Sequence, residues 1–232
     1  MAAINRSTDM TTGSIWKRMV SFAVPVFLGN LCQQLYNTVD SVIVGKFVGK
    51  QALAAVGGPT GTVINLLIGF FVGLSSGATV IISQYYGAKR EEMVGYAVHT
   101  AITASVISGA VLMVIGFVGA PFALNAMGTP EDIVGFATLY MRIYFLGTIA
   151  NLIYNIGSGI LRAVGDSKRP LYFLIASCFA NIILDIVFVV YFHMGIAGAA
   201  LATIISQFVS AILCIIRLSR SPEDYRVHIR KI

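Results

Sequence analysis

The stretch NLCQQLYNTVDSVIVG, residues 30–45, is the second half of a long apolar run that nevertheless contains an aspartate, Asp40. A carboxylate in the hydrocarbon of a membrane costs at least about 2.5–3.5 kcal/mol, so Asp40 must face protein or water. At about 100° per residue, four polar residues share one narrow sector of a helix: Asn30, Gln33, Asn37 and Asp40. The stretch therefore predicts a membrane-spanning helix with a polar stripe along one side.

The composition of the whole chain agrees with a membrane protein. Of its 232 residues, 57% are hydrophobic and only 11% are charged, whereas a soluble domain carries about 25% charged residues. Apolar runs of roughly 18 or more residues recur along the chain, which is typical of transmembrane helices. We therefore predict an all-α integral membrane protein with almost no soluble part.

The apolar runs are separated by charged residues or by Gly and Pro, and they predict six transmembrane helices over residues 17–44, 51–86, 94–118, 131–164, 170–192 and 196–218. Residues 17–218 then form one six-helix lobe, with a tail at 1–16 and a charged tail at 219–232 that could also begin a linker. Proline inside a helix kinks it, so Pro25 and Pro59 predict kinks in the first and second helices.

The basic residues sort according to the side of the membrane. Of the 16 lysines and arginines, 13 fall in loops and tails on one side of the predicted bundle, and only Lys46 and Lys50 fall on the other. Cytoplasmic loops carry an excess of Lys and Arg, so we expect both tails in the cytoplasm and the chain in the cytoplasmic membrane. Arg142, inside a span, is expected to reach toward the outer interface. No basic patch is left over for nucleic acid.

Several other classes of protein are disfavoured by the residues. The cysteines lie inside apolar runs without a CxxC spacing, which argues against a disulfide framework and against a metal site. Intramembrane aspartyl proteases carry a tyrosine before one aspartate, whereas Asp40 follows Val39 and Asp185 follows Leu184. The chain also shows neither a selectivity-filter sequence nor a ring of like residues typical of a channel. We therefore do not expect an enzyme.

A second carboxylate, Asp185, lies inside a predicted span. Ser177, Asn181 and Asp185 follow an i, i+4, i+8 row on the fifth helix. Polar rows on the fourth and sixth helices include Tyr140, Tyr144, Asn151, Asn155, Ser158, Thr203, Gln207 and Ser210. Such rows are most easily accommodated if they face one shared interior.

Two interpretations of these rows remain. Serine, threonine and glycine commonly pack membrane helices together, as the pair Gly69 and Gly73 in a GxxxG spacing illustrates. Two carboxylates with Asn181 one turn from Asp185 instead favour cation binding or proton transfer, because a buried acid pair holds helices together poorly. An ion-coupled transporter is therefore the class that the residues favour.

At this point the sequence resembles the multidrug and toxic compound extrusion (MATE) family of efflux transporters. The resemblance covers residues 16–219, and four motifs carry it together with the pattern from Pro25 to Asp40. They are VGKFVGKQALAAVG at 44–57, GLSSGATVIISQYYGAKR at 73–90, GILRAVGDSKRP at 159–170 and NIILDIVFV at 181–189.

The resemblance implies roles for particular residues. Asp40 and Asp185 match the carboxylates of the family's first and fifth helices, and Asn181 and Thr203 match positions that help to ligate sodium in some members. Tyr140 and Asn155 match a supporting hydrogen-bonded network, to which we add Asn37 and Gln33 of the first stripe. Pro25 matches the proline at which the first helix bends.

The resemblance also implies a function. Family members have about twice this length and twelve helices, so a second six-helix lobe or a homodimer partner is expected. The lobe would exchange sodium or protons for an exported drug or organic cation, with no tightly bound cofactor. Without a cation, one carboxyl of the Asp40–Asp185 pair is expected to hold a proton. A flippase for lipid-linked precursors is the alternative, and it would need arginines facing a larger cavity, for which only Arg142 is available.

Overall fold

The computed structural model describes residues 14–221 and 225–227, apart from the side chains of Ile15, Arg18 and Leu74. Most of the predicted tails, residues 1–16 and 219–232, lies outside the described residues. The described part of the chain is helical and contains no strand, which confirms the predicted all-α class.

Eight α-helices and two π-helical segments make up the described chain. In order they are α1 (Ile15–Ile43), η1 (Val44–Val48), α2 (Lys50–Gly57), α3 (Pro59–Gly87), α4 (Glu91–Ala126), α5 (Glu131–Leu146), α6 (Thr148–Ala163), α7 (Lys168–Asp185), η2 (Ile186–Tyr191) and α8 (Gly195–Ser219).

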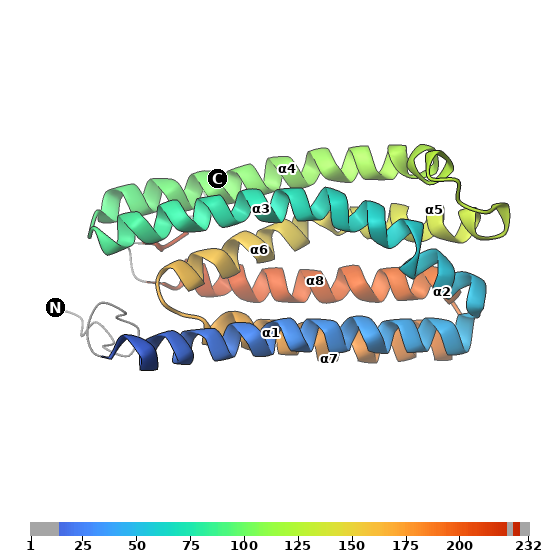
Figure 1. Cartoon of the computed structure of the whole chain (residues 1–232), viewed down its shortest axis with the longest axis horizontal. Helices are drawn as coiled ribbons and strands as arrows, with labels where there is room; N and C mark the ends of the chain where they lie inside the picture. The colour runs from blue at the N-terminus through green and yellow to red at the C-terminus, as the bar shows by residue number, and fades with distance from the viewer. Residues whose placement is uncertain (1–13, 222–224, 228–232) are drawn as a thin grey trace.

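The long helices run side by side along the longest axis of the molecule (Figure 1). The α3–α4 pair lies along one edge of the bundle and the α1–α7 pair along the other. Between them, α6 packs on α3 and α4 while α8 packs on α7, and α6 contacts α8. The α3–α4 and α6–α7 loops lie at the same end of the bundle as the start of α1 (Figure 1).

The predicted kink at Pro59 is confirmed as a break between α2 and α3. Pro59 occupies the first turn of α3, where its missing N–H is not needed by the helix. Gly58 before it is required, because a Cβ there would lie 2.6 Å from the carbonyl oxygen of Ala54. Pro25, in contrast, lies inside the continuous helix α1 and does not interrupt it.

The predicted count of six spans is approximate. By length and hydropathy, four helical stretches among the described residues could cross a membrane: 50–87, 91–126, 168–191 and 195–219. The pair α5 and α6, bent by 51°, makes a fifth if it forms one span. At 29 residues α1 is long enough, but the amides and carboxylate of its polar stripe lower its mean hydropathy. In addition, α4 continues to Ala126 instead of ending at Val118.

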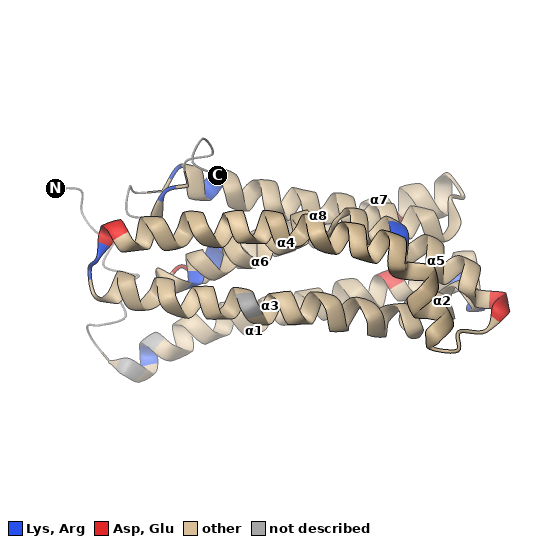
Figure 2. Ribbon diagram, turned by 90° about the horizontal axis from the view of Figure 1, so that it is seen from above, with Lys and Arg blue, Asp and Glu red and all other residues tan. Residues whose placement is uncertain are grey.

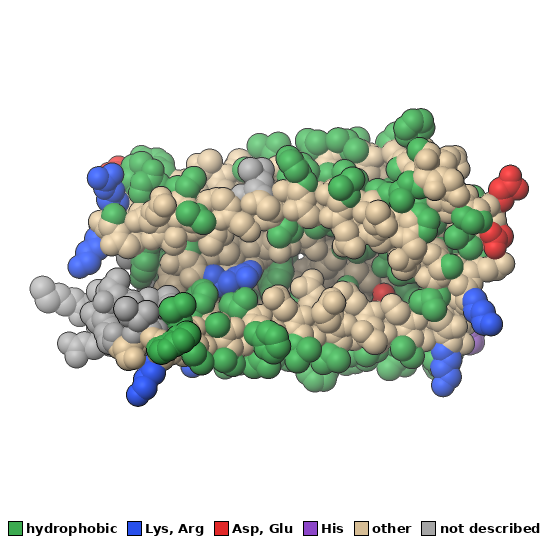
Figure 3. Space-filling view, viewed as in Figure 1, with side chains coloured by type: hydrophobic (Ala, Val, Ile, Leu, Met, Phe, Trp, Pro, Cys, Tyr) green, Lys and Arg blue, Asp and Glu red, His purple; other side chains and the backbone are tan. Residues whose placement is uncertain are grey.

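The surface of the bundle carries many exposed hydrophobic side chains, as expected for a protein that lies in a lipid bilayer. Large hydrophobic side chains such as Leu66, Phe70 and Phe122 are at least 70% exposed, and apolar side chains cover much of the molecule (Figure 3). Charged residues gather toward the two ends of the helices (Figure 2). Soluble monomers rarely expose so much contiguous apolar surface, whereas a lipid bilayer accommodates it.

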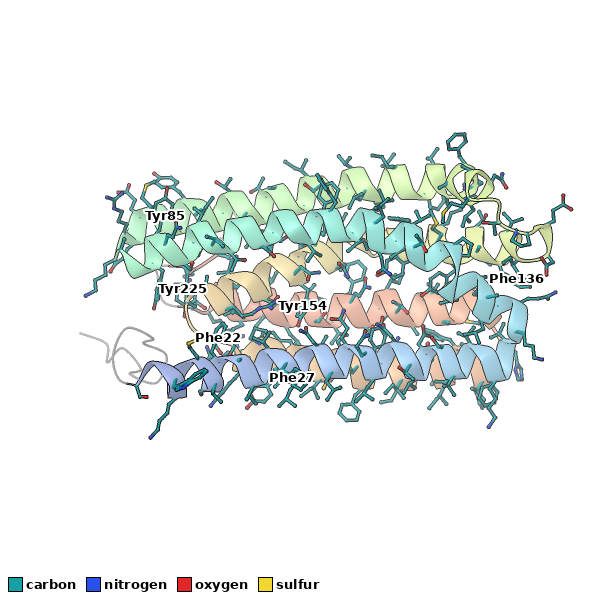
Figure 4. All side chains as sticks on the ribbon, viewed as in Figure 1. Phe22, Phe27, Tyr85, Phe136, Tyr154 and Tyr225 are labelled. Atoms are coloured by element: carbon teal, nitrogen blue, oxygen red, sulfur yellow. The ribbon has the colours of Figure 1, made fainter. Side chains whose placement is uncertain are left out.

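A short described part of the charged tail folds back onto the bundle. The ring of Tyr225 meets that of Tyr86 on α3 edge-to-face at 6.3 Å, and the Val227 amide donates to the Leu218 carbonyl at 3.3 Å. Figure 4 shows Tyr225 at the same end of the bundle as Tyr85. Tyr225 and Val227 are 9% and 2% exposed, so this segment closes the apolar core between α3, α4 and α8.

The close packing of α4 on α5 gives a test of the fold. Gly116 of α4 faces Phe145 of α5, and a Cβ at Gly116 would overlap that ring. Gly116→Ala should therefore lower the free energy of unfolding by about 1–3 kcal/mol, measured as a lower Tm in detergent. Gly119→Ala on the same helix is the control, because nothing lies within 4 Å of its Cβ position. Equal stability of the two variants would contradict the packing of α4 on α5.

Candidate functional site

The carboxyl groups of Asp40 and Asp185 meet inside the bundle. Asp40 lies in the last turn of α1, and Asp185 is the last residue of α7, which packs along α1. The two side chains are only 6% and 0% exposed, and they lie close enough to influence each other electrostatically. A hydrogen bond between two carboxyl groups requires a proton on one of them, because ionised carboxylates only accept.

Asp40 and Asp185 each lie just before a π-helical segment, in which the helix is wider than an α-helix. η1 begins at Val44, one turn after Asp40, and η2 begins immediately after Asp185. The Gly49 amide donates to Val44 and the Phe192 amide to Val187, at 3.1 and 2.9 Å, with the i to i−5 spacing of a π-helix. η1 and η2 contact each other, so the acids lie at the same level of the bundle. Single π-helical turns occur frequently at functional sites.

Unsatisfied polar atoms surround the acid pair. Asn181, one turn before Asp185 on α7, is 0% exposed. Both of its amide atoms, both Asp185 oxygens and Oδ1 of Asp40 are buried without a hydrogen-bond partner among the described residues. Each such group costs about 1–3 kcal/mol when left unpaired. The cluster is therefore suited to a bound ion or proton that satisfies several oxygens at once.

The helix α8 supplies the third wall of the site through Thr203. The Thr203 hydroxyl donates to the Ala199 carbonyl at 3.0 Å, and Tyr36 and Tyr140 lie close to it. One turn from Asn181, the Ser177 hydroxyl donates to the Ser206 carbonyl at 2.7 Å and holds α7 against α8. Asp40, Asp185, Asn181 and Thr203, the four residues predicted to handle the cation, thus belong to one buried region.

Three tyrosines form an aromatic wall beside this region. Tyr140, a predicted member of the supporting network, is 5% exposed and stacks on Tyr144 at 6.1 Å between ring centroids. Tyr36, one turn before Asp40 on α1, lies in the neighbourhood of both acids and of Tyr144. Tyr36 was missed from the sequence because it lies off the stripe of amides. Its i, i+4 spacing from Asp40 was the available signal.

The other predicted members of the network lie elsewhere. Gln33 and Asn37 are exposed, and the Asn37 amide donates to Gln34 at 3.3 Å. Gln33 points in nearly the same direction as Asp40, but it lies about 10 Å further along α1. Asn155 belongs to a second polar cluster on α6, where its amide donates to the Asn151 carbonyl and side chain at 2.9 and 3.0 Å.

That second cluster contains an arginine. Arg162 lies in the last turn of α6, half-buried, and donates to the carbonyl and the hydroxyl of Ser158 at 3.2 and 2.7 Å. Arg142, the arginine predicted inside a span, is exposed and donates to the Phe117 carbonyl at 3.3 Å, with its guanidinium 5.5 Å from the ring centroid. Close to Arg162, the hydroxyl of Tyr154 (labelled in Figure 4) donates to the Pro170 carbonyl at 3.1 Å.

The face of the molecule between α1 and α3 is hollowed (Figure 3). An acidic and a basic side chain are visible inside the hollow, in a surface that is otherwise mostly uncharged. Within the described residues, no group of three or more His, Cys, Asp or Glu could hold a metal ion. The donors near the acid pair are carboxylate, amide and hydroxyl oxygens, which suit a hard cation and not a transition metal.

Comparison with known proteins identifies relatives of this architecture. The family model MatE matches residues 25–187. The chain is 36% identical over 211 residues to the probable multidrug resistance protein YoeA of Bacillus subtilis, and 34% identical over 207 residues to YpnP of the same organism. These matches cover 89% and 87% of this chain, and 45% of each relative.

Solved structures agree with the family match. A crystal structure of MATE in the bent conformation superposes with a TM-score of 0.89 at 26% identity, over 98% of this chain and 51% of that one. An outward-facing multidrug resistance MATE family transporter superposes with a TM-score of 0.88 at 27% identity, over 97% and 50%. The chain thus spans about half the length of the relatives it matches. Since the family match extends over more than half of the sequence, the chain belongs to the MatE family and has the fold of one lobe of its transporters.

Proposed function

We propose that this chain is the cation-coupling lobe of an antiporter that exports drugs or organic cations across the cytoplasmic membrane. The observation that carries the proposal is the buried pair Asp40 and Asp185, with the unsatisfied amide of Asn181 beside it. Intramembrane carboxylates without a basic partner mark ion pathways in membrane proteins. The names of the relatives, which include multidrug resistance and multidrug export proteins, support the class of substrate.

The coupling ion is proposed to be sodium or a proton at this one site. Sodium would take a carboxylate oxygen of Asp185, the amide oxygen of Asn181 and the hydroxyl of Thr203, with Asp40 adjacent. A proton would instead be shared between the two neighbouring carboxyl groups. Either event changes the charge of a low-dielectric region by one unit. With the ion or proton bound, the site therefore disfavours a cationic substrate. Without it, the more negative site favours one.

The lobe is proposed to work with a second lobe, or with a second copy of itself. Gln33 and Asn37 of α1 are exposed, and the hollow between α1 and α3 shows an acidic and a basic side chain (Figure 3). Lipid cannot satisfy these groups, and each unsatisfied polar group in hydrocarbon costs several kcal/mol. A second lobe over this face would enclose the hollow as a path for substrate, and the relatives' additional length is sufficient to supply one.

The orientation follows from the distribution of charge. Lys17, Lys89, Arg90, Lys168 and Arg169 lie in the end of the bundle where α1 begins and α3 and α6 end. The positive-inside rule therefore places this end, and with it both tails of the chain, in the cytoplasm.

Reporter fusions test this orientation. Fusions after Arg90 and after Lys168 should report the cytoplasm, because both residues end basic loops. Fusions after Thr129 and after Met194 should report the outside, measured with a paired phosphatase and fluorescent-protein reporter. A phosphatase signal at Arg90 would overturn the proposed orientation.

Substitution of the acids tests the coupling site in the transport-competent protein that carries this chain. Asp40→Asn and Asp185→Asn should each reduce coupled efflux from vesicles to background. Neither should lower the Tm, because the substitution removes a buried charge without leaving a cationic partner unpaired. Asp166→Asn is the control: Asp166 pairs with Arg169 at 2.8 Å near the surface, so efflux should survive. Efflux that survives both acid substitutions would show that the pair is structural.

Thr203 separates the two candidate ions. Thr203→Ala removes a hydroxyl ligand that sodium needs and a proton does not, so sodium-driven efflux should fall strongly and proton-driven efflux only mildly. The measurement imposes each gradient separately on the same vesicles. Ser210→Ala on the same helix is the control, because its hydroxyl donates to the Gln207 carbonyl and not to the acid pair. Equal effects of Thr203→Ala and Ser210→Ala would contradict a ligand role for Thr203.

A further inference from the structure

A positive charge in the second polar cluster has no counter-ion within the lobe. Arg162 lies in the last turn of α6 and is half-buried. Among the described residues the one ion pair joins Arg169 to Asp166, so the carboxylate that follows α6 already has a partner. A half-buried guanidinium loses part of its hydration, which is costly unless an anion replaces the water. Arg162 is therefore expected to meet an anion that comes from outside the described part of the chain.

The guanidinium of Arg162 is held in a fixed orientation. Its Nε donates to the Ser158 carbonyl at 3.2 Å and its Nη2 to the Ser158 hydroxyl at 2.7 Å. That hydroxyl in turn donates to the Asn155 carbonyl at 3.0 Å, and Ser158 is 0% exposed. These bonds use two of the five N–H groups that a guanidinium carries. The others remain for an acceptor that approaches from outside the lobe.

The packing of α6 turns Arg162 toward the hollow between α1 and α3. Gly159 meets the Thr79 side chain of α3, and Gly157 meets Cys214 of α8. By the helical period, Arg162 lies between these two contacts, on the side of α6 turned away from α4. Figure 3 shows a basic side chain in the hollow toward the end where α1 begins, and an acidic side chain toward the other end.

An unpaired positive charge at this place would oppose the proposed export of cations. In the proposed orientation this end of the hollow is cytoplasmic, so an organic cation entering from there passes Arg162. Like charges repel strongly where little water separates them. A carboxylate beside the guanidinium removes both this repulsion and the cost of the unpaired charge. The additional length of the relatives is sufficient to supply the chain that carries it.

We propose that Arg162 forms an ion pair with a carboxylate of the second lobe, at the cytoplasmic end of the hollow. The pair fastens the two lobes to each other where α6 ends. Arginine and a carboxylate commonly pair through two parallel hydrogen bonds, which gives the contact a defined geometry. The inference rests on the proposed second lobe, and it names the charge that this lobe presents to the surface around Arg162.

Charge reversal tests the pair in the complete, transport-competent protein that carries this chain. Arg162→Glu should lower the Tm in detergent by roughly 3–8 °C, because two carboxylates then face each other. Arg162→Gln carries no charge and should lower the Tm by less. Arg169→Glu at the same end of the bundle is the control. The Arg169 side chain is 43% exposed, so its reversal should change the Tm by no more than about 1–2 °C.

A second substitution identifies the partner. Each Asp and Glu at the cytoplasmic ends of the second lobe's helices is changed to Arg in the Arg162→Glu background. One of these changes should restore roughly half or more of the lost Tm, since it recreates the pair with the charges exchanged. The same change should lower the Tm when Arg162 is intact, and it should restore nothing in the Arg169→Glu background.

Four results would overturn the inference. The first is an unchanged Tm in Arg162→Glu, and the second is a loss that no second-lobe substitution restores. The third is restoration by Arg at Glu91, Glu92 or Asp166, which would assign the pair to this lobe or to a second copy of it. The fourth is a loss that occurs only when anionic phospholipid is present, which would assign Arg162 to a lipid headgroup. Melting temperatures do not depend on coupled efflux, so these failures are distinguishable from failure of the antiport proposed for Asp40 and Asp185.

Discussion

The close approach of two carboxyl groups, those of Asp40 and Asp185, inside an apolar bundle constrains the rest of the structure. Neither group can face lipid, so α1 and α7 must pack with these residues turned inward. Neither can remain fully charged beside the other without a cation or a proton. α8 and α5 complete the enclosure with hydroxyl and aromatic groups, and the unpaired amide of Asn181 completes the oxygen set. The lobe thus encloses a cluster of buried oxygens whose desolvation a proton or a cation would offset.

The same constraint gives the lobe two different sides. Apolar side chains cover the outer surfaces of the helices, where lipid can meet them, while the hollow between α1 and α3 retains polar groups that lipid cannot satisfy. In the proposed transporter, such a lobe would carry the ion site within itself and share the substrate path with whatever covers the hollow. The match of the chain to about half of each relative's length agrees with that division.

Much of the fold followed from patterns that each helix carries by itself. The apolar runs predicted the helices because a membrane admits few other structures, and Pro59 predicted the kink that the structure shows as a break between α2 and α3, because it removes a backbone donor. The row Ser177, Asn181 and Asp185 was predictable for the same reason, since i and i+4 residues share a face. Pro25 lies inside the continuous helix α1, and the bend expected there stays a prediction.

The sequence by itself determined that two carboxylates lie in apolar helices, and that each must find polar company away from lipid. Only the tertiary structure decided which residues provide that company. The helical period sets the direction of a side chain on its own helix, but the neighbouring helix that covers it depends on how far along the axis the two helices stay in contact. Gln33 and Asp40 point almost the same way, yet one is exposed and the other buried, and Tyr36, outside the amide stripe, lies in the neighbourhood of the acids. Asn155, although in a polar row, belongs to a different cluster because α6 is bent away from α5 by 51°.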